Sequence, residues 1–285
     1  MVVQHNLTAM NSQRMLGITM DTQAKSSEKL SSGYKINRAA DDAAGLAISE
    51  KMRRQIRGLT QASLNAEDGI SCVQTAEGAL HEVHDMLQRM NELAVKGETG
   101  TLATADRNYI AMEVQQLMSE INRVQSTTTF NEKNLLDGTF TDVGLQVGAE
   151  TGQHITISIK SISCSVLNAK GWASVSKFYT TTITASITDF KSSIFGSLNT
   201  YVKKALEAVS TQRSQLGAVQ NRLEHTINNL DNVVENTTAA ESQIRDTDMA
   251  AEMVKYSNNN ILAQAGQAML AQANQANQGV LSILG

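Results

Sequence analysis

The chain has 285 residues, a net charge of −4 at pH 7, no proline and 4% aromatic residues. Large globular cores depend on aromatic side chains, so this composition favours helices that pack through thin seams of Ala, Leu, Ile, Val and Met. The lack of proline permits long helices. The acidic balance argues against broad affinity for nucleic acid or for anionic membranes.

The first predicted element is a helix over residues 2–30, with Val3, Leu7 and Met10 on one side. Gly33 follows it, and a glycine after a helix end is the usual left-handed stop. The apolar stripe weakens further along the helix. Because most helical stability in water comes from packing, such a helix needs a partner.

A second, longer helix is predicted over residues 41–95. Asp41 and Asp42 supply capping side chains and negative charge at its start. Its apolar residues recur at steps of four and three, the pattern of a helix that packs on another helix. Two successive steps of three between Ile70 and Ala76 predict a stammer, which overwinds a coiled coil locally.

The middle of the chain changes character. A third, shorter helix is predicted over residues 110–124, after which the apolar period becomes two. Residues 143–147 and 155–159 alternate apolar and polar side chains around Gly152, which predicts a β-hairpin. Residues 161–199 are rich in Ser and Thr and show no period, so we expect a short irregular insertion there.

The last part of the chain is again helical. A long helix is predicted over residues 202–244, and Asp246–Asp248 is expected to cap a restarted helix that runs to the end. From Ile261 onward there is no charged side chain, and the polar residues are mostly amides. This uncharged tail carries an apolar stripe that includes Leu262, Met269, Ala276, Val280 and Ile283.

Two interpretations of this tail stay open from periodicity alone. The tail could dock on its own domain, or it could form a surface shared by packed copies of the chain. A chain so poor in bulky apolar residues offers no obvious groove to receive the tail, which favours the assembly surface.

No arrangement of residues indicates an enzyme, a metal site or a cofactor. His81 and His84 lie three residues apart, whereas the metalloprotease helix needs histidines four apart, and no third ligand is evident. Cys72 and Cys164 have no spacing typical of a disulfide framework or a metal site. The start of the chain lacks a secretory signal pattern, and no stretch approaches the ~18 consecutive apolar residues of a membrane-spanning helix.

Several separate motifs together resemble bacterial flagellin, the subunit of the flagellar filament. The resemblance covers about residues 1–160 and 200–285. The motifs are KLSSGYKINRAADDAAGLAISE at 29–50, QRMNELAV at 88–95, TTFNEKNLL at 128–136, LQVGAETGQHITISI at 145–159, LGAVQNRL at 216–223, AAESQIRDTDM at 239–249 and MLAQANQ at 269–275.

The resemblance implies a mainly α fold, with a long antiparallel helical bundle or coiled coil and a small β-hairpin region. Residues 1–40 and 247–285 would pair as terminal helices in an inner layer. Residues 41–246 would form a rod domain of long helices and hairpin. Residues 161–199 would stand where other flagellins carry outer domains, so the chain resembles a short, minimal flagellin.

The resemblance also implies a function. The chain would assemble head to tail into the extracellular flagellar filament used for motility, after export in unfolded form by the flagellar type III system without a cleaved signal peptide. The chain termini would be disordered in the free subunit and fold when copies stack. The expected self-assembly residues are Val3, Leu7, Met10, Leu262, Met269, Ala276, Val280 and Ile283.

The partners implied by the resemblance are other copies of the chain, an export chaperone at the C-terminal helix, and the junction and cap proteins of the flagellum. A host flagellin-sensing Toll-like receptor is a further one. The receptor patch of the family falls on Gln88, Arg89, Leu93 and Glu113, although all four could equally be seam or solvated helix residues. Two other functions remain open: a hook-filament junction protein, and a secreted membrane-active translocator.

Overall fold

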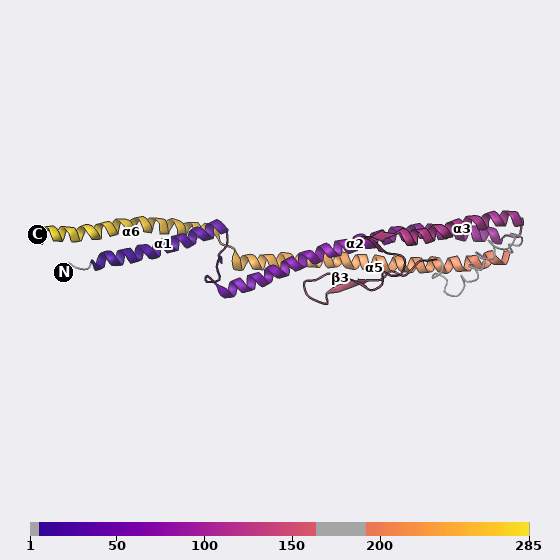
Figure 1. The fold of residues 1–285 in the computed structure, drawn as a ribbon, viewed down its shortest axis with the longest axis horizontal. Helices are drawn as coiled ribbons and strands as arrows, with labels where there is room; N and C mark the ends of the chain where they lie inside the picture. Colours follow the sequence, from indigo (N-terminus) through magenta and orange to yellow (C-terminus); the bar gives the residue numbers. More distant parts are fainter. Residues whose placement is uncertain (1–5, 164–191, 285) are drawn as a thin grey trace. The chain divides into compact units, whose positions relative to one another are not determined.

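The computed structural model describes residues 6–163 and 192–284, and most of them are helical (Figure 1). The sequence therefore predicted the mainly α class correctly. The helices are α1 (Leu7–Ser32), α2 (Ala43–Glu98), α3 (Thr104–Thr127), α5 (Ser192–Arg245) and α6 (Met249–Leu284), and the strands are β1 (Thr129–Phe130), β2 (Lys133–Asn134), β3 (Val143–Gln146) and β4 (His154–Ile157).

The chain divides into two compact units. Unit 1 comprises Met1–Arg57 and Val234–Gly285, and unit 2 comprises Gly58–Val233. Helices α2 and α5 contribute residues to both units. The domain boundaries expected from sequence, near residues 41 and 246, both fall inside unit 1.

The main hydrophobic core lies in unit 2, where α2, α3 and α5 pack together. The buried residues of α2 are spaced alternately three and four residues apart. Two successive steps of three do not occur in this series, so the predicted stammer is wrong. Gly69, rather than Ile70, occupies the buried position, because a Cβ atom on Gly69 would lie 2.3 Å from the Leu145 side chain of the hairpin. The buried series is Leu59, Ala62, Ala66, Gly69, Val73, Ala76, Leu80, Val83, Leu87, Met90 and Ala94.

Helix α5 begins earlier than the sequence suggested. It starts at Ser192, so the expectation of irregular structure is wrong for residues 192–199. Phe195 and Leu198 are buried there and lead into Val202 at steps of three and four, which extends the seam of α5. The rest of the expected insertion, residues 164–191, lies outside the described residues.

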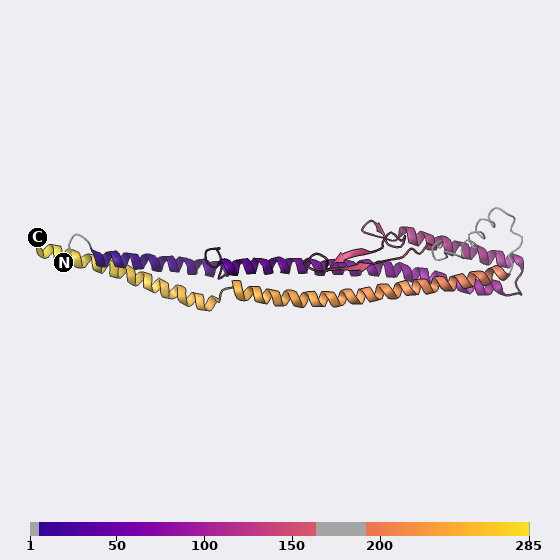
Figure 2. The ribbon, with the colours of Figure 1, turned by 90° about the horizontal axis from the view of Figure 1, so that it is seen from below.

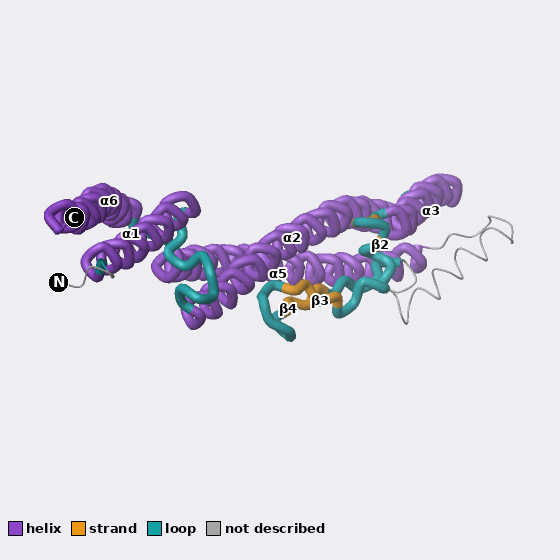
Figure 3. Tube along the Cα trace, turned by 60° about the vertical axis from the view of Figure 1, so that its left-hand side comes forward, coloured by secondary structure: helices purple, strands orange, loops and turns teal. Residues whose placement is uncertain are grey.

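The predicted hairpin is confirmed and lies along α2 and α5 in unit 2 (Figure 3). Strands β3 and β4 are antiparallel, with Leu145 opposite Ile155. Ile155 and Ile157 face the helices and are buried, while His154 and Thr156, which alternate with them, are exposed. The smaller β1–β2 pair was not predicted from sequence; its turn residue Asn131 has a positive φ of 47°.

In unit 1, helices α1 and α6 run antiparallel, side by side (Figures 1 and 2). Helix α1 ends at Gly33, which adopts the expected left-handed conformation with φ 76°. Across residues 6–163 and 192–284, no helix is both long and apolar enough to span a membrane.

Two glycines of α2 allow a matched test of packing in unit 2. A Cβ atom on Gly97 would lie 2.5–2.7 Å from ring atoms of the buried Phe195, whereas one on Gly78 would meet nothing within 4 Å. We expect Gly97→Ala to lower the free energy of unfolding by about 1–3 kcal/mol through overpacking. Gly78→Ala should raise it by up to about 1 kcal/mol, because alanine favours helix. Urea unfolding of the full chain, followed by circular dichroism, measures both changes; equal effects of the two substitutions would contradict the packing at Phe195.

Candidate assembly surface

Helices α1 and α6 meet mostly through small and polar side chains. Steps of three and four connect the least exposed positions of each helix. On α1 these positions are Ala9, Ser12, Leu16, Thr19, Gln23, Ser26 and Leu30, and on α6 they are Glu252, Tyr256, Asn259, Ala263, Gly266, Leu270 and Ala273. This set is called the pairing face below.

Three contacts place the two helices against each other. Near one end of the pair, Asn6 Nδ2 donates to the Ala273 carbonyl at 3.1 Å. In the middle, Leu16 packs on Gly266, where a Cβ atom would lie 3.2 Å from Leu16 Cδ1. Near the other end, Ser26 Oγ donates to Glu252 Oε1 at 2.7 Å. The glycine therefore lets the leucine approach closely, and a larger residue would require the Leu16 side chain to shift by a few tenths of an ångström.

Glu252 is the charged member of the pairing face. Its side chain is 8% exposed and also pairs with Lys255 Nζ at 3.2 Å. The hydrogen bond from Ser26 holds the pKa of the Glu252 carboxyl below its usual range, and Lys255 and Lys29 act in the same direction. A buried carboxylate needs such partners, because burying an unpaired charge is costly.

Apart from Leu16, Leu30 and Leu270, most of the large apolar side chains of this helix pair point outward. Leu7, Met10, Leu262 and Met269, which the sequence predicted as self-assembly residues, are exposed by 68%, 62%, 57% and 62%. The exposure of the other predicted assembly residues is not tested. Val3 lies outside the described residues, and so do the side chains of Ala276, Val280 and Ile283 on α6.

An open apolar groove runs along one flank of the pair and holds about 330 Å³. Such a patch on a surface typically marks an interaction site. The groove is lined by Asn11, Ser12, Met15, Leu16, Thr19, Leu262, Ala265, Gly266 and Met269.

The two connectors of unit 1, residues 33–42 and 246–248, are joined through main-chain hydrogen bonds. Tyr34 and Asp246 form an antiparallel bridge. On either side of it, Lys35 N donates to the Arg245 carbonyl at 2.6 Å, and Thr247 N donates to the Gly33 carbonyl at 2.9 Å. Segments far apart in the sequence are thus paired where α1 ends and α6 begins.

The Arg245 side chain strengthens this junction. Its guanidinium lies 4.5 Å from the centre of the Tyr34 ring, and it donates to Glu50 Oε1 at 3.0 Å. Arg53 pairs with Glu241 at 3.7 Å and with Glu50 at 3.6 Å. We call Tyr34, Glu50, Arg53, Glu241 and Arg245 the connector clasp. It brings together the connector after α1, the start of α2 and the end of α5.

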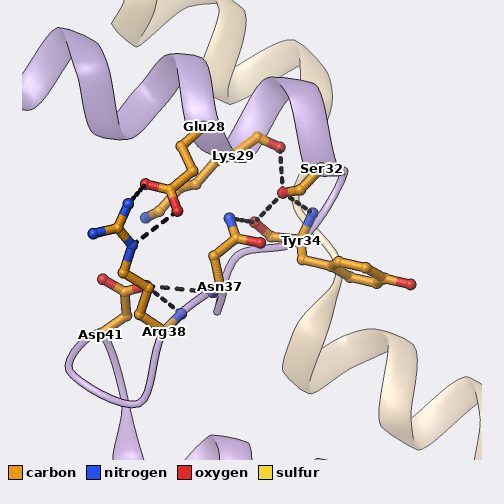
Figure 4. Close-up of polar contacts among 7 residues, drawn as sticks. All are labelled: Glu28, Lys29, Ser32, Tyr34, Asn37, Arg38 and Asp41. Atoms are coloured by element: carbon orange, nitrogen blue, oxygen red, sulfur yellow. Dashed lines mark hydrogen bonds and ion pairs between the residues drawn. The ribbon is translucent and has the colours of Figure 1, made fainter.

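The connector after α1 is ordered by its own polar contacts (Figure 4). Arg38 binds both carboxylate oxygens of Glu28, at 3.0 and 3.1 Å. Asp41 accepts from the Arg38 and Asn37 amides at 3.0 and 3.3 Å, and the Arg38 amide is the main reason that the pKa of Asp41 is lowered. Asp42 accepts from the Gly45 amide at 2.9 Å at the start of α2.

The capping roles expected for the aspartates are confirmed for Asp42 and Asp248, but not for Asp41. Asp41 stabilises the turn before α2, and Asp42 caps α2 itself. Asp248 accepts from the amides of Ala250 and Ala251 at the start of α6, as expected for a helix that restarts after residue 246.

The residues of the expected receptor patch lie in unit 2 and only partly on its surface. Arg89 binds Glu113 Oε1 through two nitrogens, at 3.0 and 2.9 Å, and so joins α2 to α3. This contact raises the pKa of Arg89. Gln88 is exposed and lies 2.9 Å from His84 Nε2. Leu93, in contrast, is 3% exposed and packs into the core.

His81 and His84, weighed from sequence as metal ligands, face other partners. His81 lies 3.9 Å from Asp85, and His84 contacts Gln88. In the part of the chain that the structure describes, no three His, Cys, Asp or Glu side chains are grouped so as to hold a metal ion. Cys72 is buried and free, and burial raises the pKa of its thiol.

Known proteins resemble this chain over its whole length. The family "Bacterial flagellin N-terminal helical region" matches residues 3–141, and "Bacterial flagellin C-terminal helical region" matches residues 200–284. The chain is 52% identical to a flagellin of Halalkalibacterium halodurans and 48% identical to a flagellin of Bacillus subtilis, with 100% of each chain covered. This chain belongs to the bacterial flagellin family.

A further relative agrees with this flagellin assignment. A flagellar filament 31.3 kDa core protein of Treponema maltophilum is 45% identical over the full length of both chains. The crystal structure of Bacillus cereus flagellin matches with a TM-score of 0.48 and 23% identity, over 59% of this chain and 88% of that one.

The flagellin assignment confirms the central expectations from sequence. The protein is a structural subunit of the extracellular flagellar filament and not an enzyme. Sequence reasoning missed the pairing face and the connector clasp. The clasp residues lie within or near two motifs that carried the resemblance, at 29–50 and 239–249, but nothing in either motif indicates that Arg245 stacks on Tyr34.

The clasp predicts a local effect of one substitution in this flagellin. Arg245→Met removes the cation–π contact, worth up to about 2 kcal/mol when desolvated, together with the ion pair to Glu50. We expect amide hydrogen exchange at Lys35 and Thr247 in assembled filaments to accelerate about tenfold or more, since about 1.4 kcal/mol corresponds to a factor of ten.

The matched control is Arg123→Met, which removes an exposed arginine that pairs with Glu120 on α3. It should leave exchange at both connector amides unchanged. Unaltered exchange in the Arg245 variant would show that the main-chain bridge holds without the clasp.

Proposed function

We propose that this flagellin polymerises through the outward apolar side chains of α1 and α6, chiefly Leu7, Met10, Leu262 and Met269. The observation that carries the proposal is that these side chains are more than half exposed, while the two helices pair through small and polar residues. Stable monomers seldom leave so many large apolar residues in water on one helix pair.

The energetics of burial support this role. Complete burial of a Leu or Met side chain contributes about 1.5–3 kcal/mol. Helices α1 and α6 bury little apolar area against each other, so their ordering depends on contacts that other copies supply. We propose that the terminal helices are disordered in the free subunit and fold on assembly, with the ordering cost offset by burial between copies. A head-to-tail interface that does not close produces an open helical polymer, with the terminal helices in its inner layer.

The same terminal helices would serve the other steps in the life of the subunit. We propose export in unfolded form through the flagellar type III system, with a chaperone that covers the apolar stripe of α6 until assembly. The absence of charged side chains from Ile261 onward supports this, because an unprotected tail of this composition would associate prematurely. The junction and cap proteins of the flagellum would contact the same helix pair at the ends of the filament.

We also propose that the exposed polar groups of α2 and α3 bind a host flagellin-sensing Toll-like receptor. Arg89 and Glu113 form an exposed ion pair, and Gln88 lies beside them. A guanidinium held in place by a carboxylate loses less side-chain entropy on binding than a free one. Leu93 would contribute from beneath, by packing under the patch.

Polymerisation tests the first proposal directly. The double substitution Leu262→Asn with Met269→Asn removes two outward apolar side chains and should raise the critical concentration for filament formation by at least about 100-fold. Gln264→Asn with Gln267→Asn, on exposed positions of the same helix, is the matched control and should polymerise normally. Sedimentation and negative-stain microscopy give the measurement. If the first variant forms filaments at the critical concentration of the wild type, these residues do not have the proposed role.

Receptor binding is tested with a second matched pair. Arg89→Ala should weaken binding to the receptor ectodomain by about 10- to 100-fold, as expected for an arginine hot spot. Arg123→Ala removes another exposed, ion-paired arginine, on α3, and should bind like wild type. Surface plasmon resonance on monomers measures both affinities, and equal affinities for the two variants would show that Arg89 is not part of the receptor site.

A further inference from the structure

The outward side chains of α1 and α6 are rich in methionine. Across the described residues of these two helices, six of the eleven exposed large apolar side chains are methionines: Met10, Met15, Met20, Met249, Met253 and Met269. In unit 2, by contrast, Met90 and Met118 lie in the core, with exposures of 0% and 3%. A thioether that faces water can react with an oxidant, whereas one inside a folded core is shielded. The outward methionines therefore give this helix pair a chemistry that leucines in their place would lack.

Two of these methionines, one from each helix, line the same groove. Met15 of α1 and Met269 of α6 both belong to the wall of the open groove of about 330 Å³. Their exposures are 54% and 62%. The other four exposed methionines do not line this groove. Since the chain is a filament subunit, we take the molecule that covers the groove to be another copy of the chain.

A hydroperoxide oxidises a methionine thioether by transfer of one oxygen atom. With hydrogen peroxide, the O–O bond breaks, a sulfur–oxygen bond forms, and water is released; the sulfur is oxidised by two electrons and the peroxide is reduced. The product, methionine sulfoxide, is polar where the thioether was apolar. Leucine fills a similar volume but has no sulfur to oxidise, so it is the natural replacement for testing this chemistry.

The groove is a poor environment for a sulfoxide once it is covered. Four of its lining residues offer no side-chain hydrogen-bond donor: Leu16, Leu262, Ala265 and Gly266. The Thr19 hydroxyl already donates to the Met15 carbonyl at 2.9 Å. While the groove is open, water satisfies the sulfoxide oxygen. When a neighbouring copy covers the groove, that water is displaced, and burying a polar group without a partner is costly. Oxidation therefore opposes the contact that the thioethers favour.

We propose that Met15 and Met269 are oxidation sites that control polymerisation: a hydroperoxide converts their thioethers to sulfoxides in the free subunit, and the oxidised subunit does not add to a filament. A methionine sulfoxide reductase reverses the step, in which two thiols become a disulfide and the oxygen leaves as water. The effect on assembly rests on the proposed function, in which another copy covers α1 and α6. The reactivity of the thioethers does not, because both are exposed whether or not these helices are folded in the free subunit.

A competition within the wild-type chain tests the proposal without any substitution. Free subunits are partly oxidised with hydrogen peroxide, polymerised and sedimented, and peptide mass spectrometry then measures each sulfoxide in the pellet and in the supernatant. Sulfoxides at Met15 and Met269 should be at least about tenfold more frequent in the supernatant, a difference of about 1.4 kcal/mol. Met20 and Met249, which are exposed outside the groove, are the internal controls, and their sulfoxides should distribute equally. An equal distribution for Met15 and Met269 would overturn the proposal.

A matched pair of variants gives a second measurement, in which each fully oxidised sample is compared with its own untreated sample. Oxidation should raise the critical concentration of the wild type at least about 100-fold. Met15→Leu with Met269→Leu should reduce that increase at least about tenfold, whereas Met20→Leu with Met249→Leu should leave it as in wild type. An increase in the first variant as large as in wild type would contradict the assignment.

Enzymatic reduction shows whether sulfoxides cause the loss of assembly. Treatment of the oxidised wild type with methionine sulfoxide reductases for both sulfoxide epimers should restore the original critical concentration, and the thiol reductant alone should not. Recovery with the thiol alone would assign the effect to an oxidised cysteine and overturn the proposal.

The outcomes separate this inference from the proposed function. If Leu262→Asn with Met269→Asn blocks polymerisation while the oxidised wild type polymerises normally, the oxidation sites are refuted and the assembly surface stands. If both polymerise normally, the assembly surface itself is refuted, and the inference with it. If Met15 and Met269 in free subunits oxidise no faster than the buried Met90 and Met118, the inference alone fails.

Discussion

The close approach of α1 and α6 through small side chains is the constraint on which the rest of unit 1 depends. Gly266 lies so close to Leu16 that a larger residue would require the leucine side chain to shift, and serines, threonines and alanines occupy half of the remaining seam. Packing of this kind gives shape specificity but buries little apolar area, so its contribution to stability is small. Under the proposed assembly, neighbouring subunits would supply the apolar burial that this helix pair lacks by itself.

The connector clasp limits how α1 and α6 can pair. Two helices that bury little apolar area against each other could pair in several registers if their connectors were independent. The bridge between Tyr34 and Asp246 sets the register at the point where both helices leave the connectors, and Arg245 ties that bridge to α2 through Glu50. Arg245 is also the last residue of α5. A change in the conformation of one connector would therefore alter the contacts of the other.

Periodicity predicted the parts of the molecule whose stability comes from apolar burial. The steps from Leu80 to Met90 placed the core face of α2 correctly, and the alternation around Ile155 and Ile157 placed the hairpin. Periodicity failed where a small or polar residue takes a buried position. The apolar pattern points to Ile70 rather than to Gly69, because only the approach of Leu145 in the folded chain shows why a glycine occupies the buried position. The pairing face of α1 could not be found for the same reason, since Thr19, Gln23 and Ser26 carry no hydrophobic signal.

The distribution of charge in unit 1 explains how specificity and adaptability coexist. Ion pairs concentrate near the connectors: Glu28 with Arg38, Glu50 with Arg245, and Glu252 with Lys255. From Ile261 to the end of the chain there is no charge. Charge-assisted hydrogen bonds have strict geometry, whereas apolar contacts depend on area and tolerate changes of angle. Under the proposed assembly through α1 and α6, directional interactions act where one chain must fold in a single way, and non-directional ones would act where copies pack together along the filament.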